Sequence, residues 1–366
     1  MHSDPSALVT VIVPIYNVEK YLEQCLSSIA SQTHESLEVL CINDGSTDSS
    51  RDIAERFASN DKRFVVISKR NEGYGASCNL GIEKARGKWI SIIEPDDWIS
   101  PTMYEDMLNL AGRFEEEVDV VKTPWIEVRF WDNPETQAER PCTLYKRMKT
   151  SIEPFVIKDN PILLEAHPSI WSALYRKKFL DEKNIRFIPY PGAGWADNPF
   201  LIESLCQASS ILYLDTLYYH YRTDLPGSTL NHQSDEAIAR PFDRWIDMMR
   251  MLDELGVDDR GVLEAHHVRG FDYVAGAICD DGWDNPLVRS KTREVFEMMD
   301  ESIVVECPRI NARKKRLFFE VTERPAPRLF RLTRAKFLAS ETLHLIKIYG
   351  IKLITEHASF HLPSEA

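Results

Sequence analysis

The sequence predicts an α/β fold: a doubly wound, mostly parallel sheet followed by a helical C-terminal region. Over the first 120 residues, short apolar runs rich in β-branched residues alternate with stretches whose apolar residues recur at helical spacing. Beyond residue 235 only the helical spacing continues, for example through Trp245, Met248 and Leu252. These two observations predict an N-terminal α/β domain over residues 1–232 and a helical region over 233–366.

The first elements alternate in order along the chain. Residues 8–13 are predicted to form a buried strand that ends at Pro14, and an amphipathic helix begins at Val18. The turn over residues 44–48 supplies capping side chains for a second helix. The remaining predictions here are strands over 37–42, 64–68 and 89–93, and helices that reach about Ser59 and span 76–85.

Downstream elements are less regular. Six prolines interrupt residues 123–168, so we expect an irregular insertion there. Strand and helix signals resume over 171–175 and 179–183 and from about Pro199, and two further strands are predicted over 211–214 and 217–221.

Composition places the chain among ordinary globular proteins, because 43% of its 366 residues are hydrophobic and 28% are charged. We find neither an apolar run of about 18 residues nor the pattern of a signal peptide, so we expect a cytoplasmic protein. A net charge of −13 makes nucleic acid an unsuitable partner. Seven cysteines without C-x-x-C spacing predict buried, reduced thiols.

The C-terminal segment differs in charge from the rest. Residues 311–366 carry 11 Lys and Arg against 5 Asp and Glu. Over 313–336 the basic residues are interleaved with Leu and Phe, which fits peripheral contact with an anionic membrane and equally fits a helical face packed on the acidic body. The sequence does not indicate an oligomeric state.

Four loops follow predicted strands, and they define a candidate site. Residues 14–17, 44–46, 71–75 and 94–97 should meet in one crevice, because ligands of such sheets bind beyond the carboxyl ends of the strands. The chain has no G-x-x-x-x-G-K-[ST] loop and no G-x-G-x-x-G after the first strand, which disfavours ATPases and dinucleotide enzymes.

Three motifs lie in these loops: PIYNVEKYL over 14–22, NDGSTD over 43–48 and EPDDW over 94–98. Taken together and in this order, they resemble glycosyltransferase family 2, over roughly residues 8–230. The resemblance implies the GT-A fold and a nucleotide-sugar-dependent transferase.

The resemblance also implies a nucleotide site. Tyr16 offers a flat face to a base, and Asp44 matches the acid that accepts a hydrogen bond from uracil N3, which indicates a UDP-sugar donor. Loop packing for Tyr16 and turn stabilisation for Asp44 are the alternatives. The expected nucleotide-binding residues are Pro14, Tyr16, Asn17, Glu19, Asp44, Asn71, Gly75 and Asp96.

By the same resemblance, Asp97 would bind a divalent cation, Mn²⁺ or Mg²⁺, and Asp96 would contact the ribose or a metal-bound water. His220 occupies a position where some family members complete the metal coordination. The pair Glu94-Pro95 stands where an acid and a small residue are more usual in the family, so the role of Glu94 stays open. A helix-capping role for the two aspartates is the alternative.

The resemblance assigns the general base to Asp197 in the segment PGAGWADNPF over 191–200, with a helix N-cap as the alternative. Ala196 and Pro199 depart from the family pattern. Diphosphate contacts are expected from Arg222 and Ser228. His167 and Trp171 are expected to line the acceptor pocket, although Trp171 also fits a core position.

These assignments predict an inverting, metal-dependent glycosyltransferase that moves a sugar from a UDP-sugar to a glycan or lipid-linked glycan acceptor in surface polysaccharide biosynthesis. Inversion follows from the resemblance, with one base and direct displacement. A sugar-1-phosphate nucleotidyltransferase is disfavoured, because the basic, glycine-rich triphosphate loop is missing. A catalytically inactive GT-A module that binds nucleotide or acts as a scaffold is the alternative from another class, and Ala196 and Pro199 support it.

Overall fold

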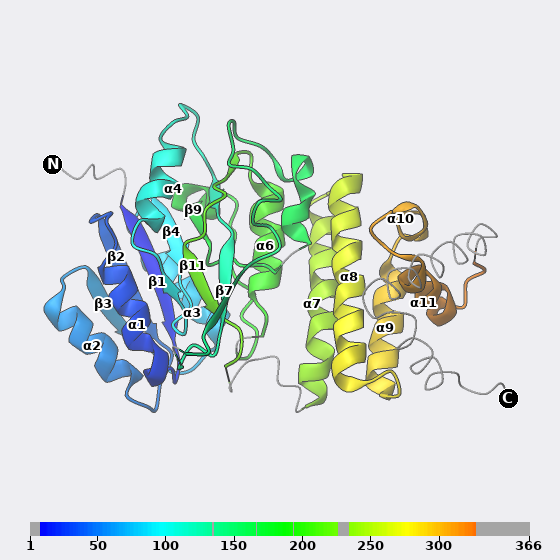
Figure 1. The fold of residues 1–366 in the computed structure, drawn as a ribbon, viewed down its shortest axis with the longest axis horizontal. Helices are drawn as coiled ribbons and strands as arrows, with labels where there is room; N and C mark the ends of the chain where they lie inside the picture. The colour runs from blue at the N-terminus through cyan, green and yellow to red at the C-terminus, as the bar shows by residue number, and fades with distance from the viewer. Residues whose placement is uncertain (1–7, 134, 166, 193, 226–233, 327–366) are drawn as a thin grey trace. The chain divides into compact units, whose positions relative to one another are not determined.

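The computed structural model describes residues 8–326, apart from 134, 166, 193 and 226–233 (Figure 1). The chain divides into two compact units, residues 1–291 and 292–366. This division lies beyond the boundary expected near residue 232, because two long helices group with the α/β unit.

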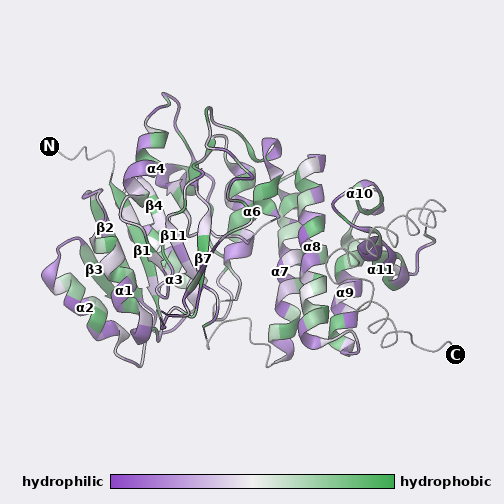
Figure 2. Ribbon diagram, viewed as in Figure 1, coloured by the Kyte–Doolittle hydropathy of each residue, from purple (hydrophilic) through white to green (hydrophobic). Residues whose placement is uncertain are grey.

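A mixed seven-stranded sheet forms the centre of the first unit. Its strand order is β10-β6-β9-β4-β1-β2-β3, and β9 is antiparallel to both of its neighbours. Every residue of β1 and β2 is buried, as expected when helices cover both faces of a sheet (Figures 1 and 2). The strands are β1 (Val9–Ile15), β2 (Leu37–Asn43), β3 (Phe64–Ser68), β4 (Trp89–Ile92), β6 (Val120–Lys122), β9 (Ala173–Arg176) and β10 (Ile211–Tyr213).

The helices of this half follow the predicted pattern. The helix that buries Leu22, Cys25, Leu26 and Ile29 does so because these residues share one face. The order of strands and helices predicted over residues 8–93 is confirmed, with ends that differ by a few residues. The helices are α1 (Glu19–Ala30), α2 (Ser50–Asn60), α3 (Tyr74–Lys84), α4 (Met103–Ala111), α5 (Lys177–Glu182) and α6 (Asp197–Gln207).

A second, four-stranded sheet has the order β5-β11-β7-β8. Its strands are β5 (Trp98–Ile99), β7 (Trp125–Arg129), β8 (Ala138–Pro141) and β11 (Tyr219–Arg222). Two of them lie in the segment expected to be irregular, which otherwise contains only the short turns η2 (Ile157–Asp159) and η3 (Pro161–Leu164) among its described elements. The four residues of β8 are all exposed, so no alternation of apolar and polar residues marked it.

Two helices complete the first unit, α7 (Asp235–Glu254) and α8 (Arg260–Asp281). The side chain of Ser234 caps α7 and that of Asp259 caps α8. Trp245 of α7 donates from Nε1 to the backbone carbonyl of His266, at 2.9 Å, and the two rings stack with centroids 4.7 Å apart. Helix α7 also packs against α6, so this helical pair lies beside the α/β layers (Figure 1).

The second unit begins at Thr292 within α9 (Pro286–Met298) and contains α10 (Glu301–Glu306) and α11 (Ala312–Thr322). Helix α11 buries Phe318, Phe319 and Val321. The part of the basic segment beyond residue 326 lies outside the described residues, so both interpretations of it stay open. Among the described residues, no helix has the length and apolar character needed to cross a membrane.

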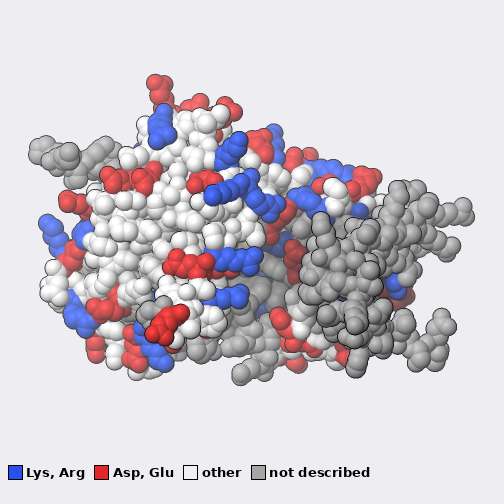
Figure 3. Space-filling view, viewed as in Figure 1, with Lys and Arg blue, Asp and Glu red and all other residues white. Residues whose placement is uncertain are grey.

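None of the seven cysteines, all of which lie among the described residues, forms a disulfide, as expected. Five are buried, Cys206 is partly exposed, and Cys279 of α8 is exposed, contrary to the expectation that all would be buried. On the face drawn in Figure 3, acidic and basic side chains are interspersed. The charge on this face therefore forms no broad field of one sign.

Gly81 of α3 allows this helix to lie directly on β1. A Cβ added at Gly81 would lie 2.4 Å from Cγ2 of Ile12, a branched side chain in the middle of the core strand. We expect Gly81→Ala to lower the free energy of unfolding by about 1 to 3 kcal/mol, as overpacking of a core does. Urea denaturation measures this change.

Gly276→Ala is the matched control, because a Cβ at this position in α8 meets no atom within 4 Å. It should raise the free energy of unfolding by about 0.5 to 1 kcal/mol, the helix preference for alanine. Equal stability of the two variants would show that α3 does not pack on β1 as described.

Candidate active site

The loops after β1 and β2 hold each other through Asn17 and Glu19. The Oδ1 atom of Asn17 accepts a hydrogen bond from the backbone N–H of Thr47, at 2.8 Å. Oε2 of Glu19 accepts from the N–H of Ser49 at 2.9 Å, and the N–H of Glu19 donates to Asp48 at 3.0 Å. Asn17 and Glu19, which were both expected to bind the nucleotide, therefore use their side chains to join the two loops.

Asp44 organises the loop after β3 and is only 3% exposed. Its Oδ1 accepts hydrogen bonds from Lys69 Nζ and from the N–H of Glu72, and its Oδ2 accepts from the N–H of Gly73 at 2.9 Å. A carboxylate has about four acceptor positions, so one position on Oδ2 stays open to a further donor. The turn-stabilising role expected as an alternative is therefore present.

The other expected nucleotide residues fall into two groups. Tyr16 presents 49% of its surface to solvent, and Asn71 is also exposed. Pro14 is buried within β1, and Gly75 is buried where a Cβ would lie 2.8 Å from the carbonyl oxygen of Ile188. Tyr16 and Asn71 can therefore touch a ligand, whereas Gly75 permits close packing of the chain.

Asp97 is completely buried. Its Oδ2 accepts a hydrogen bond from the hydroxyl of Tyr219, and its Oδ1 accepts from the N–H of Arg222, both at 2.8 Å. Burial, together with the neighbouring Asp96, raises the pKa of Asp97 well above its usual range. The structure thus uses Asp97 to anchor β11 and keeps its carboxylate away from solvent.

Asp96 and Glu94 differ from Asp97 and from each other. Glu94 accepts a hydrogen bond from the hydroxyl of Tyr74 at 2.6 Å, and burial raises the pKa of Glu94 to about 8. Asp96 is partly exposed, and no other side chain among the described residues donates to its carboxylate. Asp96 is therefore the member of this cluster with oxygens available to a ligand.

Arg222 is only 3% exposed, and its guanidinium is enclosed by aromatic rings. It donates to Gln24 and to the backbone carbonyl of Asp96. Its Cζ lies 4.5 Å from the ring centroid of Trp98, 4.7 Å from that of Trp131 and 5.4 Å from that of Tyr21. This arrangement ties β11 to α1 and differs from the expected diphosphate contact. Ser228, the other expected contact, lies outside the described residues.

His220 also differs from the expectation. Its Nε2 lies 3.1 Å from Oγ of Ser100, and its ring stacks on Trp98 with centroids 4.9 Å apart. Side chains alternate along a strand, so His220 points away from the face on which Tyr219 contacts Asp97. Within the described ranges, no group of three or more His, Cys, Asp or Glu residues is placed to hold a metal ion.

An aromatic cluster lies where the acceptor pocket was expected. Trp171 is 2% exposed and stacks on Tyr219 with ring centroids 3.9 Å apart, so it occupies a core position. His167 is exposed, and its ring lies 5.3 Å from that of Tyr221. Of the two expected acceptor residues, only His167 can touch a substrate.

Lys122, at the end of β6, holds the loop that carries His167. Its buried Nζ donates to the backbone carbonyls of Pro168 and Ser169 and to the hydroxyl of Ser169, at 3.2, 2.8 and 2.9 Å. Burial lowers the pKa of Lys122 to about 7. Sequence reasoning missed this residue, because no strand was predicted over β6.

Asp197 is the first residue of α6 and is partly exposed. The N-cap is Ala196 and no side chain caps this helix, so the expected alternative of an Asp197 N-cap is wrong. Burial raises the pKa of Asp197 to about 6, and its charge in turn raises the pKa of Glu94. Pro199 lies in the first helical turn, where proline is tolerated. The departures at Ala196 and Pro199 thus leave α6 intact.

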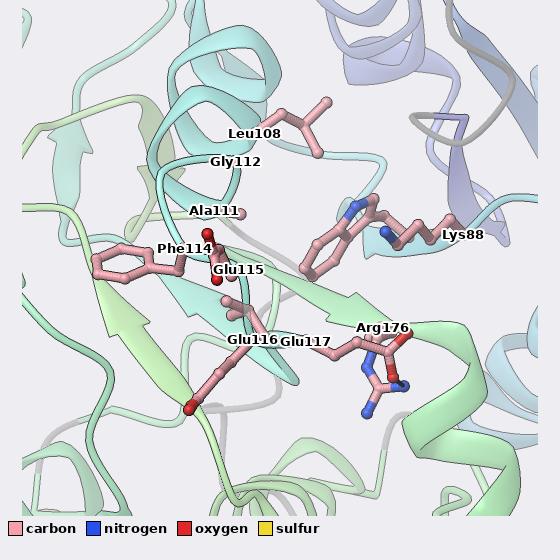
Figure 4. Close-up of a pocket in the computed structure, with 11 residues that line it drawn as sticks. Lys88, Leu108, Ala111, Gly112, Phe114, Glu115, Glu116, Glu117 and Arg176 are labelled. Carbon is pink, nitrogen blue, oxygen red and sulfur yellow. Dashed lines mark hydrogen bonds and ion pairs between the residues drawn. The ribbon is translucent and has the colours of Figure 1, made fainter.

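A hollow of about 280 Å³ lies elsewhere (Figure 4). Its walls include Lys88 and Trp89, at the start of β4, and Arg176, which forms an ion pair with Glu117 at 2.8 Å. The acidic cluster follows the other end of β4. This hollow is therefore separate from the candidate active site.

Comparison with known proteins agrees with this geometry. Residues 10–180 match the family model described as Glycosyl transferase family 2. Over these residues the chain is similar to glycosyltransferase family 2. EpsH of Bacillus subtilis, which carries the name of a glycosyltransferase, is 34% identical over 227 residues, 62% of this chain and 63% of EpsH. YibD of Escherichia coli, named an uncharacterized glycosyltransferase, is 27% identical over 295 residues, 79% of this chain and 83% of YibD.

The GT-A fold is confirmed by solved structures. Residues 1–349 of Staphylococcus aureus TarS, crystallised with UDP-GlcNAc, superpose with a TM-score of 0.67 at 18% identity, covering 86% of this chain and 87% of that one. The family 2 match ends at residue 180, before Asp197. The site thus continues into a part of the chain where the family model gives no assignment.

Helix α8 also reaches the candidate site. Arg269, 2% exposed, lowers the pKa of Asp197 through its charge, and Tyr273 donates from its hydroxyl to Asn198, at 2.6 Å. No sequence pattern indicated these residues, because helical periodicity shows which face of a helix is buried and not what that face contacts.

The three hydrogen bonds that Asp44 accepts lead to a prediction that can be tested without a ligand. In Asp44→Asn, the new amide nitrogen cannot accept from Lys69, Glu72 or Gly73, so buried donors lose a partner. We expect the free energy of unfolding to fall by about 1 to 3 kcal/mol. Asn71→Ala, at an exposed position of the same loop, should stay within about 0.5 kcal/mol of the wild type. Chemical denaturation compares the two, and an unchanged Asp44→Asn protein would contradict the assigned contacts.

Proposed function

We propose that this chain is an inverting glycosyltransferase that moves a sugar from a UDP-sugar donor to a hydroxyl of a glycan acceptor, with the help of a divalent cation. The observation that carries the proposal is the position of Asp197. Its partly exposed carboxylate stands beside the strand-end acids of a GT-A domain without capping its own helix.

Asp197 suits the role of general base. An acceptor hydroxyl must lose its proton as it attacks the anomeric carbon, and a base works best when its pKa lies near the working pH. Burial brings the pKa of Asp197 to about 6, so the carboxylate is ionised at neutral pH and still basic enough to take a proton. One base and one displacement invert the anomeric configuration.

The donor would bind at the loops after β1, β2 and β3. The exposed ring of Tyr16 offers a stacking surface for uracil, and the open acceptor position on Asp44 Oδ2 suits the N3–H of that base. Asn17 and Glu19 hold these loops in register. Because the TarS structure contains UDP-GlcNAc, this nucleotide sugar is the first donor to test.

Asp96 is the residue that would hold a divalent cation. Mg²⁺ is typically bound through one or two carboxylates together with substrate phosphates and waters, so a single accessible carboxylate fits this chemistry without a cage of protein ligands. The cation would neutralise charge that develops on the departing diphosphate. Asp97 holds β11 in place beside it, through Tyr219 and Arg222.

The acceptor would lie against His167 and Tyr221. Both rings belong to the aromatic cluster, and Tyr221 is close enough to Asp197 for that charge to raise the pKa of its hydroxyl. A glycan destined for the cell surface fits the names of relatives. The minor teichoic acid biosynthesis protein GgaB of Bacillus subtilis is 36% identical over 118 residues. The basic residues over 313–336 support action at the cytoplasmic face of an anionic membrane.

The role of Asp197 predicts a large loss of rate without a loss of donor affinity. Asp197→Asn keeps the shape of the side chain but removes its basicity, so transfer from UDP-GlcNAc should fall by about 10² to 10⁴-fold. The affinity for UDP, measured by calorimetry, should stay within about twofold of the wild type. In the wild type, log(kcat/KM) should rise with pH up to about 6 and then level off, because protonated Asp197 cannot accept a proton.

Asp224→Asn is the control, since Asp224 is an exposed carboxylate whose Oδ2 accepts from the N–H of Phe130. Normal turnover in Asp197→Asn, with loss in Asp224→Asn, would move the base to Asp224. Tight UDP binding without turnover of any UDP-sugar in the wild type would favour an inactive nucleotide-binding module.

The metal assignment predicts different results for the three candidate ligands. Asp96→Asn should abolish the stimulation of transfer by Mn²⁺ while leaving the stability of the protein nearly unchanged, because its carboxylate is not bonded to another described side chain. Asp97→Asn should lower the thermal stability, since the clasp on β11 is broken. His220→Ala should keep the stimulation by Mn²⁺. Full activity in excess EDTA would remove the cation from the proposal.

A further inference from the structure

Two hydrogen bonds connect α8 to the carboxylate of Asp197. The hydroxyl of Tyr273 donates to Oδ1 of Asn198 at 2.6 Å, and Nδ2 of Asn198 donates to Oδ1 of Asp197 at 3.2 Å. Asn198 is 3% exposed, so solvent does not supply substitute partners. The three side chains form a relay from a helix outside the family match to the start of α6.

We propose that Tyr273 is a positioning residue, which fixes the orientation of the Asn198 amide and thereby sets the proton affinity of Asp197. This inference rests on the proposed function of Asp197 as the base. Tyr273 does not contact the substrate in this role, and acts through Asn198 alone.

The orientation of the amide matters because its two ends have opposite polarity. With its oxygen held by the Tyr273 hydroxyl, the NH₂ group of Asn198 faces Asp197 and stabilises the ionised carboxylate. An amide turned by half a rotation would place its oxygen against the carboxylate and destabilise the ionised form. Because the ionised carboxylate can only accept, the first orientation is favoured, and the Tyr273 hydroxyl reinforces it by donating to the amide oxygen.

The packing around Tyr273 supports this role. Its ring meets that of Trp195 edge to face, with centroids 5.6 Å apart, and Trp195 has a left-handed backbone with φ of 56°. The guanidinium of Arg269, one turn earlier on α8, lies 6.0 Å from the Tyr273 ring centroid. These two contacts limit the positions open to the hydroxyl of Tyr273.

Other groups also act on Asp197, and they stay in place when the Tyr273 hydroxyl is removed. The one cation among them is Arg269 of α8, which favours the ionised form. The titratable groups that face Asp197 from neighbouring elements are Tyr74 and Cys78 of α3, Glu94 after β4, Tyr175 of β9, Tyr221 of β11 and Tyr273 itself.

The test is a titration of the Asp197 carboxyl by ¹³C NMR in the full chain, with the resonance assigned through Asp197→Asn. Tyr273→Phe removes only the hydroxyl, and we expect the pKa of Asp197 to rise by about one unit, because a hydrogen bond to its charged form is weakened. The acidic limb of log(kcat/KM) with UDP-GlcNAc should move to higher pH by the same amount. At pH 6, transfer should fall about three- to tenfold while UDP affinity is unchanged.

Tyr218→Phe is the matched control. This change also removes a single tyrosine hydroxyl, which here donates to the carboxylate of Asp106 at 2.9 Å. None of the acids of the site affects the pKa of the Tyr218 hydroxyl. Tyr218→Phe should leave the titration of Asp197 unchanged. Asn198→Ala should reproduce the effect of Tyr273→Phe, and the double variant should add nothing further, because both changes break one relay.

The outcomes separate this inference from the proposed function. An unchanged pKa of Asp197 in Tyr273→Phe, or an equal shift in Tyr218→Phe, overturns the relay whatever the activity. A shifted pKa together with normal transfer by Asp197→Asn supports the relay and shows that the proposed base is wrong.

Discussion

The candidate site depends on the hydrogen bonds that the buried carboxylate of Asp97 accepts. This carboxylate accepts hydrogen bonds from the Tyr219 hydroxyl and from the N–H of Arg222, and so fastens β11 to the loop that follows β4. β11 pairs with both β5 and β7, so this contact fixes the position of the second sheet. The same strand carries Tyr221 to the acids. The carboxylate that joins the two sheets is also shielded from solvent.

The sequence predicted the loops of the site better than the roles of their residues. Strand ends could be located from apolar runs, and their convergence follows from parallel topology. Residue type did not reveal which oxygens the protein itself would use. Asn17, Glu19 and Asp97 have the polar groups that a ligand needs, yet backbone and hydroxyl donors of the protein engage them. Only the atomic contacts distinguish these residues from Asp96, to whose carboxylate no other described side chain donates.

Other features were beyond sequence reasoning for a different physical reason. The exposed strand β8 has no hydrophobic face, so no alternation marks it. The rings around Arg222 come from α1, β5 and the segment after β7, which meet only through tertiary packing. Likewise, Lys122 is an unremarkable strand residue until the loop with Ser169 folds over its ammonium group. Such contacts join residues far apart in the chain, and no local periodicity encodes them.

The dependence of α6 on α8 has a consequence for chimeric proteins. The family match ends at residue 180, which makes that point a tempting junction for exchanging catalytic halves between relatives. A junction there would join one protein's nucleotide loops to another protein's α6 and α8. It would also take Gly73 and the 190–192 loop from different parents. A Cβ at Gly73 would lie 2.9 Å from the carbonyl oxygens of Tyr190 and Gly192, so the two must match. A junction between α8 and α9, before Pro286, keeps both contacts within one parent and leaves each helix whole.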